Sequence, residues 1–333
     1  MSDVTIAPLV LSLAVQIKIR GKNKTFNFFQ ILKLLRLSQM KLPTFLIIGI
    51  EKSGTTSIYD YLKQHPQVYM SPIKETNFLE REWEDVDNPN PRKIRTFEAY
   101  CNLFKDATDE IAIGEASPNY LFHYQSSSER IDRYVPDVKM MAILRDPVQR
   151  AYSDYLMHVR DAINFGEVSS LYEQAKFKSN TSFTIRKGFY YEPVKYFFEK
   201  FGRDRVKIYL YDDLCQDSGA LMQDIYRYIG VDDRFIADTS KKAQQAAVPK
   251  NIFLNKLLKK KNPLRSAIAS ALKLITTEEM REKMRGKIIS LNSKGKEALP
   301  LTPEEKEILR ELYREDVLKL QDLLQRDLSN WLN

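Results

Sequence analysis

A segment rich in glycine and hydroxyl side chains follows the first strongly apolar run of the chain. The apolar run, residues 44–50, is typical of a strand buried on both faces, and residues 57–65 have helical spacing that stops at Pro66. Such a loop can hold a phosphate, because a helix N-terminus offers unpaired N–H groups and a positive dipole end. Gly54 permits close backbone approach, and Lys52 adds positive charge. Four residues supply hydroxyl donors: Ser53, Thr55, Thr56 and Ser57.

A second anion-binding pattern follows another buried strand, predicted at residues 139–144. Arg145 comes at the C-terminal end of this strand, where ligands collect in open α/β sheets, and a guanidinium can bind a phosphate through two parallel hydrogen bonds. Pro147 suits the first turn of the helix predicted at 147–160, and Ser153 lies one or two turns into it. The alternative is structural: Arg145 pairs with Asp146, and Ser153 is only solvated.

The glycine-rich loop does not follow the Walker A pattern of nucleotide kinases. That pattern requires the lysine directly after the second glycine, whereas Lys52 precedes Gly54. A kinase-like P-loop enzyme that uses a nucleoside triphosphate is therefore the alternative function. A structural turn with an exposed lysine is the non-functional interpretation.

Strands alternate with helices over most of the chain, which predicts an α/β fold with a parallel sheet covered by helices on both faces. Besides the two strands above, apolar runs predict strands at 110–114 and 206–211. Helical spacing predicts further helices at 126–135, 192–201, 221–229 and 251–274. The last helix should start at Thr302, which can form a capping box with Glu305, and run to about Gln325.

Taken together, the two loops resemble the nucleotide-binding motifs of sulfotransferases that use 3′-phosphoadenosine 5′-phosphosulfate (PAPS). Residues 52–56, KSGTT, resemble the 5′-phosphosulfate loop of that family, and residues 144–155, LRDPVQRAYSDY, resemble its 3′-phosphate motif. Residues 74–78, KETNF, and 114–120, GEASPNY, resemble segments of the heparan-sulfate-type and bacterial branches. The ending RDLSNW, at 326–331, is similar to that of bacterial members.

The resemblance implies one sulfotransferase domain over residues 42–333, with the P-loop-kinase-like fold and PAPS as sulfuryl donor. It implies that Lys52 stabilises the leaving phosphate and that Glu75 acts as the general base, with Lys74 steadying negative charge. His123 is the reserve candidate for the base, because the small-molecule branch of the family uses a histidine base. Residues 188–190 resemble a Gly-x-Tyr beside the nucleotide, which makes Tyr190 a candidate cofactor contact. The acceptor would be a hydroxyl or amine of a carbohydrate or small metabolite.

The net charge of +8 is concentrated in two segments. Residues 1–41 hold 7 basic residues and 1 acidic one, and residues 241–277 hold 9 basic residues and none that are acidic. Such segments can contact nucleic acid, a membrane surface or an anionic ligand. Nucleic acid is disfavoured, because Phe253 is the one aromatic residue in 241–277. We expect 1–41 to form a basic extension. Its segment 26–37 is apolar and basic at near-helical spacing, and it either packs on the domain or contacts a membrane surface or a partner. We expect the loop and helix segment 241–300 to lie near the cleft.

Apolar runs long enough to span a membrane are absent from the sequence, and Asp3 precedes the apolar residues 8–15, unlike the order in a secretory signal. The two cysteines, Cys101 and Cys215, exclude a disulfide scaffold, and the three histidines show no metal-ligand spacing. These features lead us to expect a cytoplasmic bacterial enzyme that holds no metal.

Overall fold

The computed structural model describes residues 41–81, 94–165, 168–240 and 299–333, together with four short strands. The strands β1 (Val15–Ile19) and β2 (Lys22–Phe26) pair antiparallel, as do β8 (Val248–Pro249) and β9 (Ser293–Lys294). Two predictions concern residues outside this description: the helix at 251–274 and most of an amphipathic segment, 26–37, within the basic extension. The expected membrane contact of residues 1–41 stays a prediction.

Five parallel strands form the central sheet, in the spatial order β4-β5-β3-β6-β7. Their bounds are β3 (Phe45–Gly49), β4 (Val68–Met70), β5 (Ala112–Ala116), β6 (Lys139–Leu144) and β7 (Val206–Leu210). The predicted parallel sheet is confirmed. The sequence did not reveal the three-residue strand β4, and β5 begins two residues later than its predicted position.

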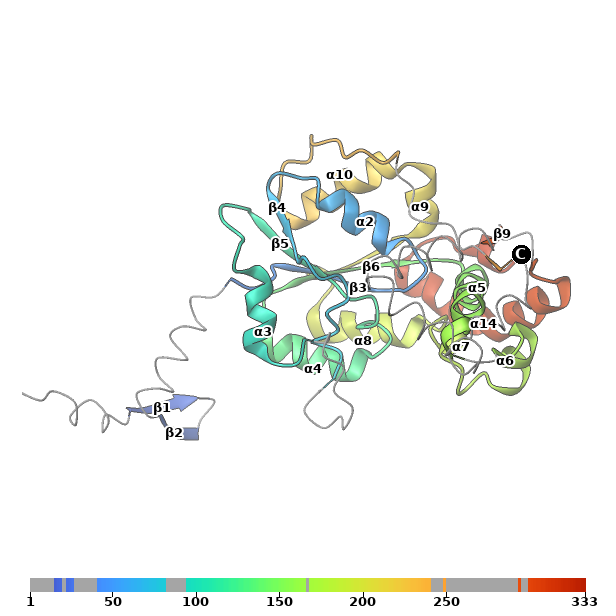
Figure 1. Ribbon diagram of the computed structural model, residues 1–333, viewed down its shortest axis with the longest axis horizontal. Coiled ribbons are helices and arrows are strands. Elements are labelled where there is room, and N and C mark those ends of the chain that lie inside the picture. Colours follow the sequence, from blue (N-terminus) through green and yellow to red (C-terminus); the bar gives the residue numbers. More distant parts are fainter. Residues whose placement is uncertain are drawn as a thin grey trace, which may run out of the picture.

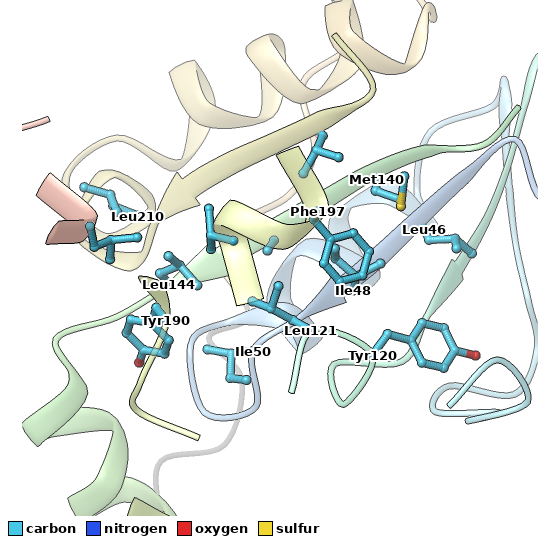
Figure 2. Close-up of a cluster of buried hydrophobic side chains, with 14 of the residues drawn as sticks. Leu46, Ile48, Ile50, Tyr120, Leu121, Met140, Leu144, Tyr190, Phe197 and Leu210 are labelled. Carbon is cyan, nitrogen blue, oxygen red and sulfur yellow. The ribbon is translucent and has the colours of Figure 1, made fainter. Parts of the chain in front are cut away.

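Both faces of the sheet are covered by helices, as the alternation of buried side chains in β3 requires (Figure 1). Leu46 and Ile48 pack into one apolar cluster, part of which is drawn in Figure 2. That face is covered by α3 (Phe97–Cys101), α4 (Tyr124–Tyr134), α5 (Pro147–Phe165), α8 (Tyr191–Phe201) and α14 (Pro303–Leu324). Phe45 and Ile47 pack into the second cluster, with α2 (Thr55–Leu62), α9 (Tyr211–Gln216) and α10 (Ser218–Ile229).

The helix α14 begins where its sequence predicts and packs against α5 and α8. The Thr302 side chain accepts from the N–H of Glu305, whose carboxylate accepts in return from the Thr302 N–H. After α14 the chain turns back, and the indole N–H of Trp331 donates to Asp212 over 3.1 Å. This contact brings the end of the chain to the start of α9.

The strand order identifies the edge of the sheet at which a ligand should bind. From β3 the chain passes to β4 and β5 on one side, and then crosses to β6 on the other side. In open α/β sheets ligands bind beside the carboxyl ends of the strands at such a reversal. The two predicted anion-binding loops follow β3 and β6, so both lie at this edge.

None of the helices that the structure describes combines the length and the hydrophobicity needed to cross a membrane.

Candidate active site

The loop after β3 ends in a helix N-terminus that is open to a ligand. The helix α2 begins at Thr55, and its N-cap residue, Gly54, has φ of 96°, so no side chain caps its first N–H groups. The hydroxyl oxygen of Ser53 is buried and has no hydrogen-bond partner in the part of the chain that the structure describes. Uncapped N–H groups at a helix N-terminus, with an orphaned hydroxyl two residues before the helix, are features of an anion site.

Gly54 is required by the packing as well as by its backbone conformation. A Cβ atom at this position would lie 2.7 Å from Cδ2 of Leu214 and 3.1 Å from Cδ2 of Tyr211. Both neighbours belong to α9, so α9 fixes the height of the loop above the sheet. The predicted loop residues lie on the turn before α2 and on its first residues. Lys52 and Ser57 are half-buried, Thr55 is buried, and Thr56 is exposed.

Arg145 joins the second motif to the first. Its Nη1 donates to the carbonyl oxygen of Lys52 over 3.1 Å, and its Cζ lies 4.6 Å from the ring centroid of Tyr211. The carboxylate of Asp146 accepts from the N–H of Val148 over 2.8 Å and so caps α5. The two loops that the sequence predicted separately thus contact each other directly, and Asp146 serves the helix.

Lys52 lies against α5, beside a buried carboxylate that the sequence did not single out. Its Nζ is 3.4 Å from Sδ of Met157, and Ser153 is one turn earlier on the same helix face. Asp154 is 1% exposed and forms an ion pair with Arg150 over 3.4 Å. Burial favours a neutral Asp154, but Arg150, His158, Lys187 and Lys52 outweigh it and hold the pKa of Asp154 below its ordinary value. Asp154 is therefore an anionic counter-charge, chiefly to Arg150, and Lys52 is one of the further cations that stabilise it.

Tyr190 lies behind Arg145 and is only 1% exposed. Its hydroxyl donates to the Arg145 carbonyl oxygen over 2.9 Å, and its ring packs near Trp331. Gly188 is needed for packing, because a Cβ there would lie 2.7 Å from the ring of Tyr313. These contacts make Tyr190 a support for the backbone of Arg145, and its contact with a cofactor stays a prediction.

Asp316 of α14 holds the backbone of the Tyr190 segment, accepting from the N–H groups of Tyr190 over 2.8 Å and Tyr191 over 3.2 Å. Burial, with a smaller contribution from Glu192, raises the pKa of Asp316 to about 6, although the two N–H groups oppose the shift. The carboxyl group therefore binds its proton more tightly in the folded chain than in the unfolded chain, where its pKa is about 3.9.

We expect the stability of the protein relative to an Asp316→Asn variant to fall as pH rises from about 4 to about 6. Over this range the folded state binds more protons than the unfolded state. The free energy of unfolding, measured relative to the variant, should therefore fall by roughly 3 kcal/mol in total and stay constant at higher pH. Urea unfolding of both proteins between pH 4 and pH 7 measures the difference. A difference that does not change with pH would contradict the raised pKa.

The loop that carries Lys74 and Glu75 lies at the end of β5, next to β3. The N–H of Glu75 donates to the Ala116 carbonyl oxygen over 2.8 Å, and Glu75 and Asn77 have φ of 64° and 53°. The Lys74 ammonium forms an ion pair with Glu75 over 2.5 Å, and 43% of the Glu75 side chain is exposed. The fold thus presents the predicted base at the same sheet edge as Lys52.

A buried carboxylate, that of Glu115, is hydrogen-bonded to this loop through Thr76. Its Oε1 accepts from Ser117 and from Thr76, the latter over 2.9 Å, and hydroxyls of Tyr100 and Tyr120 lie 3.3 Å from its carboxylate oxygens. Glu115 is fully buried, and burial raises its pKa even though the hydroxyl groups stabilise the anion. Because Thr76 lies between Glu75 and Asn77, this network fixes the backbone of the candidate base.

Replacing Glu115 by alanine is expected to lower the free energy of unfolding by ~2–4 kcal/mol, because buried hydroxyl groups would lose their acceptor. Glu115→Gln is the matched control, since its amide oxygen can still accept and its volume is nearly unchanged; it should cost less than half as much. Urea unfolding followed by circular dichroism measures both losses. Equal losses in the two variants would show that the hydrogen-bond network is not what stabilises this region.

The three histidines differ in their surroundings. His123 is half-buried, with Nε2 3.5 Å from Oε1 of Glu80, and burial, followed by Lys187, Arg81 and Arg186, lowers its pKa. His65 is buried, and its Nε2 lies 2.9 Å from the Asp232 carbonyl oxygen. His158 contacts Thr184. His123 lies near the loop after β3, and His158 directly follows Met157, which contacts Lys52. The role of His123 as a base stays a prediction.

Within the described residues, no group of three or more histidine, cysteine, aspartate or glutamate side chains could hold a metal ion.

The fold and the two loops at this edge are typical of α/β proteins that bind a phosphate-bearing ligand between the loops of two central strands. The model of the sulfotransferase domain family matches residues 42–317, and the chain belongs to that family.

Among solved structures, a sulfotransferase from Alicyclobacillus acidocaldarius is 27% identical, with a TM-score of 0.62 over 88% of this chain and 100% of that one. The family and the P-loop-kinase-like fold implied by the motifs are confirmed.

Two curated relatives show where the sequence similarity lies. Carbohydrate sulfotransferase 15 of Rattus norvegicus is 33% identical over 151 residues, covering 34% of this chain and 27% of the relative. Bifunctional heparan sulfate N-deacetylase/N-sulfotransferase 4 of Mus musculus is 26% identical over 305 residues, covering 87% of this chain and 31% of the relative. The match spans less than a third of the length of these relatives.

Proposed function

We propose that the protein transfers a sulfuryl group from PAPS to a hydroxyl or amine group of an acceptor, either a carbohydrate or another small metabolite. The observation that carries the proposal is the hydrogen bond from Arg145 to the Lys52 carbonyl oxygen, which makes the two motifs one site. A donor with phosphate groups at both ends of its ribose needs such a pair of anion sites. Membership of the sulfotransferase family supports the same donor.

The residues at the site fit this donor. The uncapped N-terminus of α2 and the orphaned hydroxyl of Ser53 would bind the 5′-phosphate, together with hydroxyls of Thr55, Thr56 and Ser57. Arg145 and Ser153 would bind the 3′-phosphate, since Ser153 shares its helix face with the Met157 side chain that Lys52 contacts. When bound, PAPS supplies the sulfuryl group and a phosphate leaving group.

Lys52 is the residue that would stabilise negative charge on the leaving phosphate. A fixed ammonium aimed at developing charge lowers the barrier without reorganisation at the moment of transfer. Asp154 supports this role, because Lys52 is one of the cations that lower its pKa, after Arg150, His158 and Lys187. Asp154 is therefore proposed as a positioning residue for Lys52.

Glu75 is the proposed general base that takes the proton from the acceptor. Its exposed side chain at the end of β5 can reach a bound molecule, and it forms an ion pair with Lys74. Lys74 would in turn steady negative charge on the acceptor side. His123, whose lowered pKa leaves it neutral near pH 7, remains the second candidate for this proton transfer.

A carbohydrate acceptor is proposed on the strength of the relatives, whose names specify carbohydrate and heparan sulfate. The test is transfer of labelled sulfur from [35S]PAPS to a panel of oligosaccharides and small hydroxyl and amine compounds, with [γ-32P]ATP in parallel. The proposal predicts that labelled PAPS gives labelled product with at least one of these compounds and that labelled ATP gives none. Phosphorylated product from ATP with no transfer from PAPS would refute it and favour the kinase-like alternative.

A further inference from the structure

A cluster of aromatic and cationic side chains surrounds the short helix α7 (Phe183–Arg186), outside the motifs discussed above. Phe183 is 55% exposed, and the ring centroid of Phe122 lies 5.7 Å from its own at an interplanar angle of 73°. The guanidinium carbon of Arg186 lies 5.2 Å from the Phe122 centroid and 6.0 Å from the Phe183 centroid. Because Phe183 and Arg186 are three residues apart on α7 and both exposed, they present a ring and a charge side by side.

This cluster adjoins the candidate active site. The Lys187 ammonium forms an ion pair with Glu51, the residue before Lys52, and lies 5.8 Å from the Phe122 centroid. On the other side, the N–H of Leu121 donates to the Ile48 carbonyl oxygen at the end of β3 over 2.7 Å. The cluster therefore lies directly beside the loop that carries Lys52.

The positive charges of this cluster favour a negatively charged ligand. In the described part of the chain no carboxylate lies within 4.0 Å of the Arg186 guanidinium, although Lys187 is paired with Glu51. The pKa of His123, which packs against Phe122, is lowered by burial first and then by Lys187, Arg81 and Arg186, whereas Glu51 opposes the shift, so three cations act on this ring. An exposed phenyl ring next to an exposed cation suits a ligand that can cover the ring and pair with the charge.

We propose that Phe122, Phe183, Arg186 and Lys187 form the acceptor subsite, and that the acceptor presents a flat apolar ring face together with an anionic group. Two compound classes share this chemistry: a phenol that carries a carboxylate, and a uronic acid whose pyranose ring has an apolar C–H face. The ring would stack on Phe183, and the anion would bind Arg186. This inference rests on the proposed sulfuryl transfer, because it specifies the acceptor for that reaction.

The test is binding of four small probes to the protein saturated with adenosine 3′,5′-bisphosphate (PAP), followed by ligand-observed NMR titration. The charged probes are 4-hydroxyphenylacetate and methyl glucuronide, and their neutral counterparts are 4-hydroxyphenylacetamide and methyl glucoside. The variants are Phe183→Ala and Arg186→Gln. The matched controls are Phe177→Ala, at an exposed ring on α6 (Leu171–Phe177), and Arg314→Gln, at an exposed arginine on α14.

At least one charged probe should bind about tenfold more tightly than its neutral counterpart, and the class that does so identifies the kind of acceptor. Arg186→Gln should abolish this preference, Phe183→Ala should weaken both members of the pair, and the control variants should behave like the unmodified protein. The subsite is refuted if no charged probe is preferred, or if both variants bind like the unmodified protein. Failure of the unmodified protein to bind PAP would instead refute the proposed function.

Discussion

Replacing Glu75 by glutamine is expected to lower kcat by about 10²–10⁴-fold, the usual effect of removing a general base. Glutamine has nearly the shape of glutamate, but its amide cannot take the proton from the hydroxyl or amine group that receives the sulfuryl group. The affinity for PAP should change by less than about twofold, because Glu75 lies at the end of β5 and the proposed phosphate ligands follow β3 and β6. Steady-state kinetics with labelled PAPS and calorimetric titration with PAP measure the two quantities.

A His123→Asn variant separates the two candidate bases. If Glu75 is the base, the His123 variant should keep kcat within about tenfold, since His123 would act at most through its neighbours. The assignment of Glu75 fails if Glu75→Gln turns over like the unmodified protein, and loss of turnover in His123→Asn alone would move the base to His123. Glu98→Gln, at an exposed glutamate in the first turn of α3, controls for loss of surface charge.

Replacing Arg145 by alanine is expected to weaken PAP binding by about 10²–10³-fold. The change would remove charge-assisted hydrogen bonds to the 3′-phosphate and also the contact that joins the two loops through the Lys52 carbonyl oxygen. Arg145→Lys keeps the charge but lacks the planar fork, so it should recover only part of the affinity. Calorimetric titration with PAP measures all three proteins.

The matched control for Arg145 is Arg227→Ala, because Arg227 is an exposed arginine on α10 that pairs with Asp233. This variant should bind PAP like the unmodified protein. Equal affinities of the Arg145→Ala and Arg227→Ala variants for PAP would show that Arg145 does not contact the nucleotide. Urea unfolding of the Arg145 variant distinguishes loss of a ligand contact from loss of the fold.

Much of the fold could be predicted because its central strands are buried on both faces. The runs that became β3 and β6 are continuous in hydrophobicity, and helices follow them in the order that a parallel sheet requires. The strand β4 escaped prediction because three residues are too few to show a period. The segments 1–40 and 241–298 lie largely outside this comparison.

The anion-binding loops could also be predicted, since their residue types carry the chemistry locally. The residues that support them could not, because their roles depend on partners distant in the sequence. Glu115 became the centre of a network through Thr76 and Tyr100, and Asp154 became a counter-charge through Arg150 and Lys52. Both carboxylates lie inside segments that carry the family resemblance, 114–120 and 144–155, but the sequence did not indicate that either would be buried.

The contacts of Arg145 also depend on residues that are distant in the sequence: its guanidinium stacks on Tyr211, and the Tyr190 hydroxyl donates to its carbonyl oxygen. The sequence predicted a guanidinium at the end of β6, and packing of α9 and the 188–190 segment decides where it points. For Tyr190 the resemblance suggested a place beside the nucleotide, and the structure adds that its side chain is enclosed by protein. Burial is a tertiary property, which one local motif does not reveal.

The central claim is that the loops after β3 and β6 form one site for a nucleotide with phosphates at both the 3′ and 5′ positions. Calorimetric titration of the unmodified protein with PAP, adenosine 5′-monophosphate and ATP–Mg²⁺ tests it most directly. The account predicts one PAP bound per chain, at least about 10²-fold more tightly than the monophosphate, because the latter lacks the group that Arg145 binds. Equal affinity for PAP and the monophosphate, or tight binding of ATP–Mg²⁺ alone, would contradict the account.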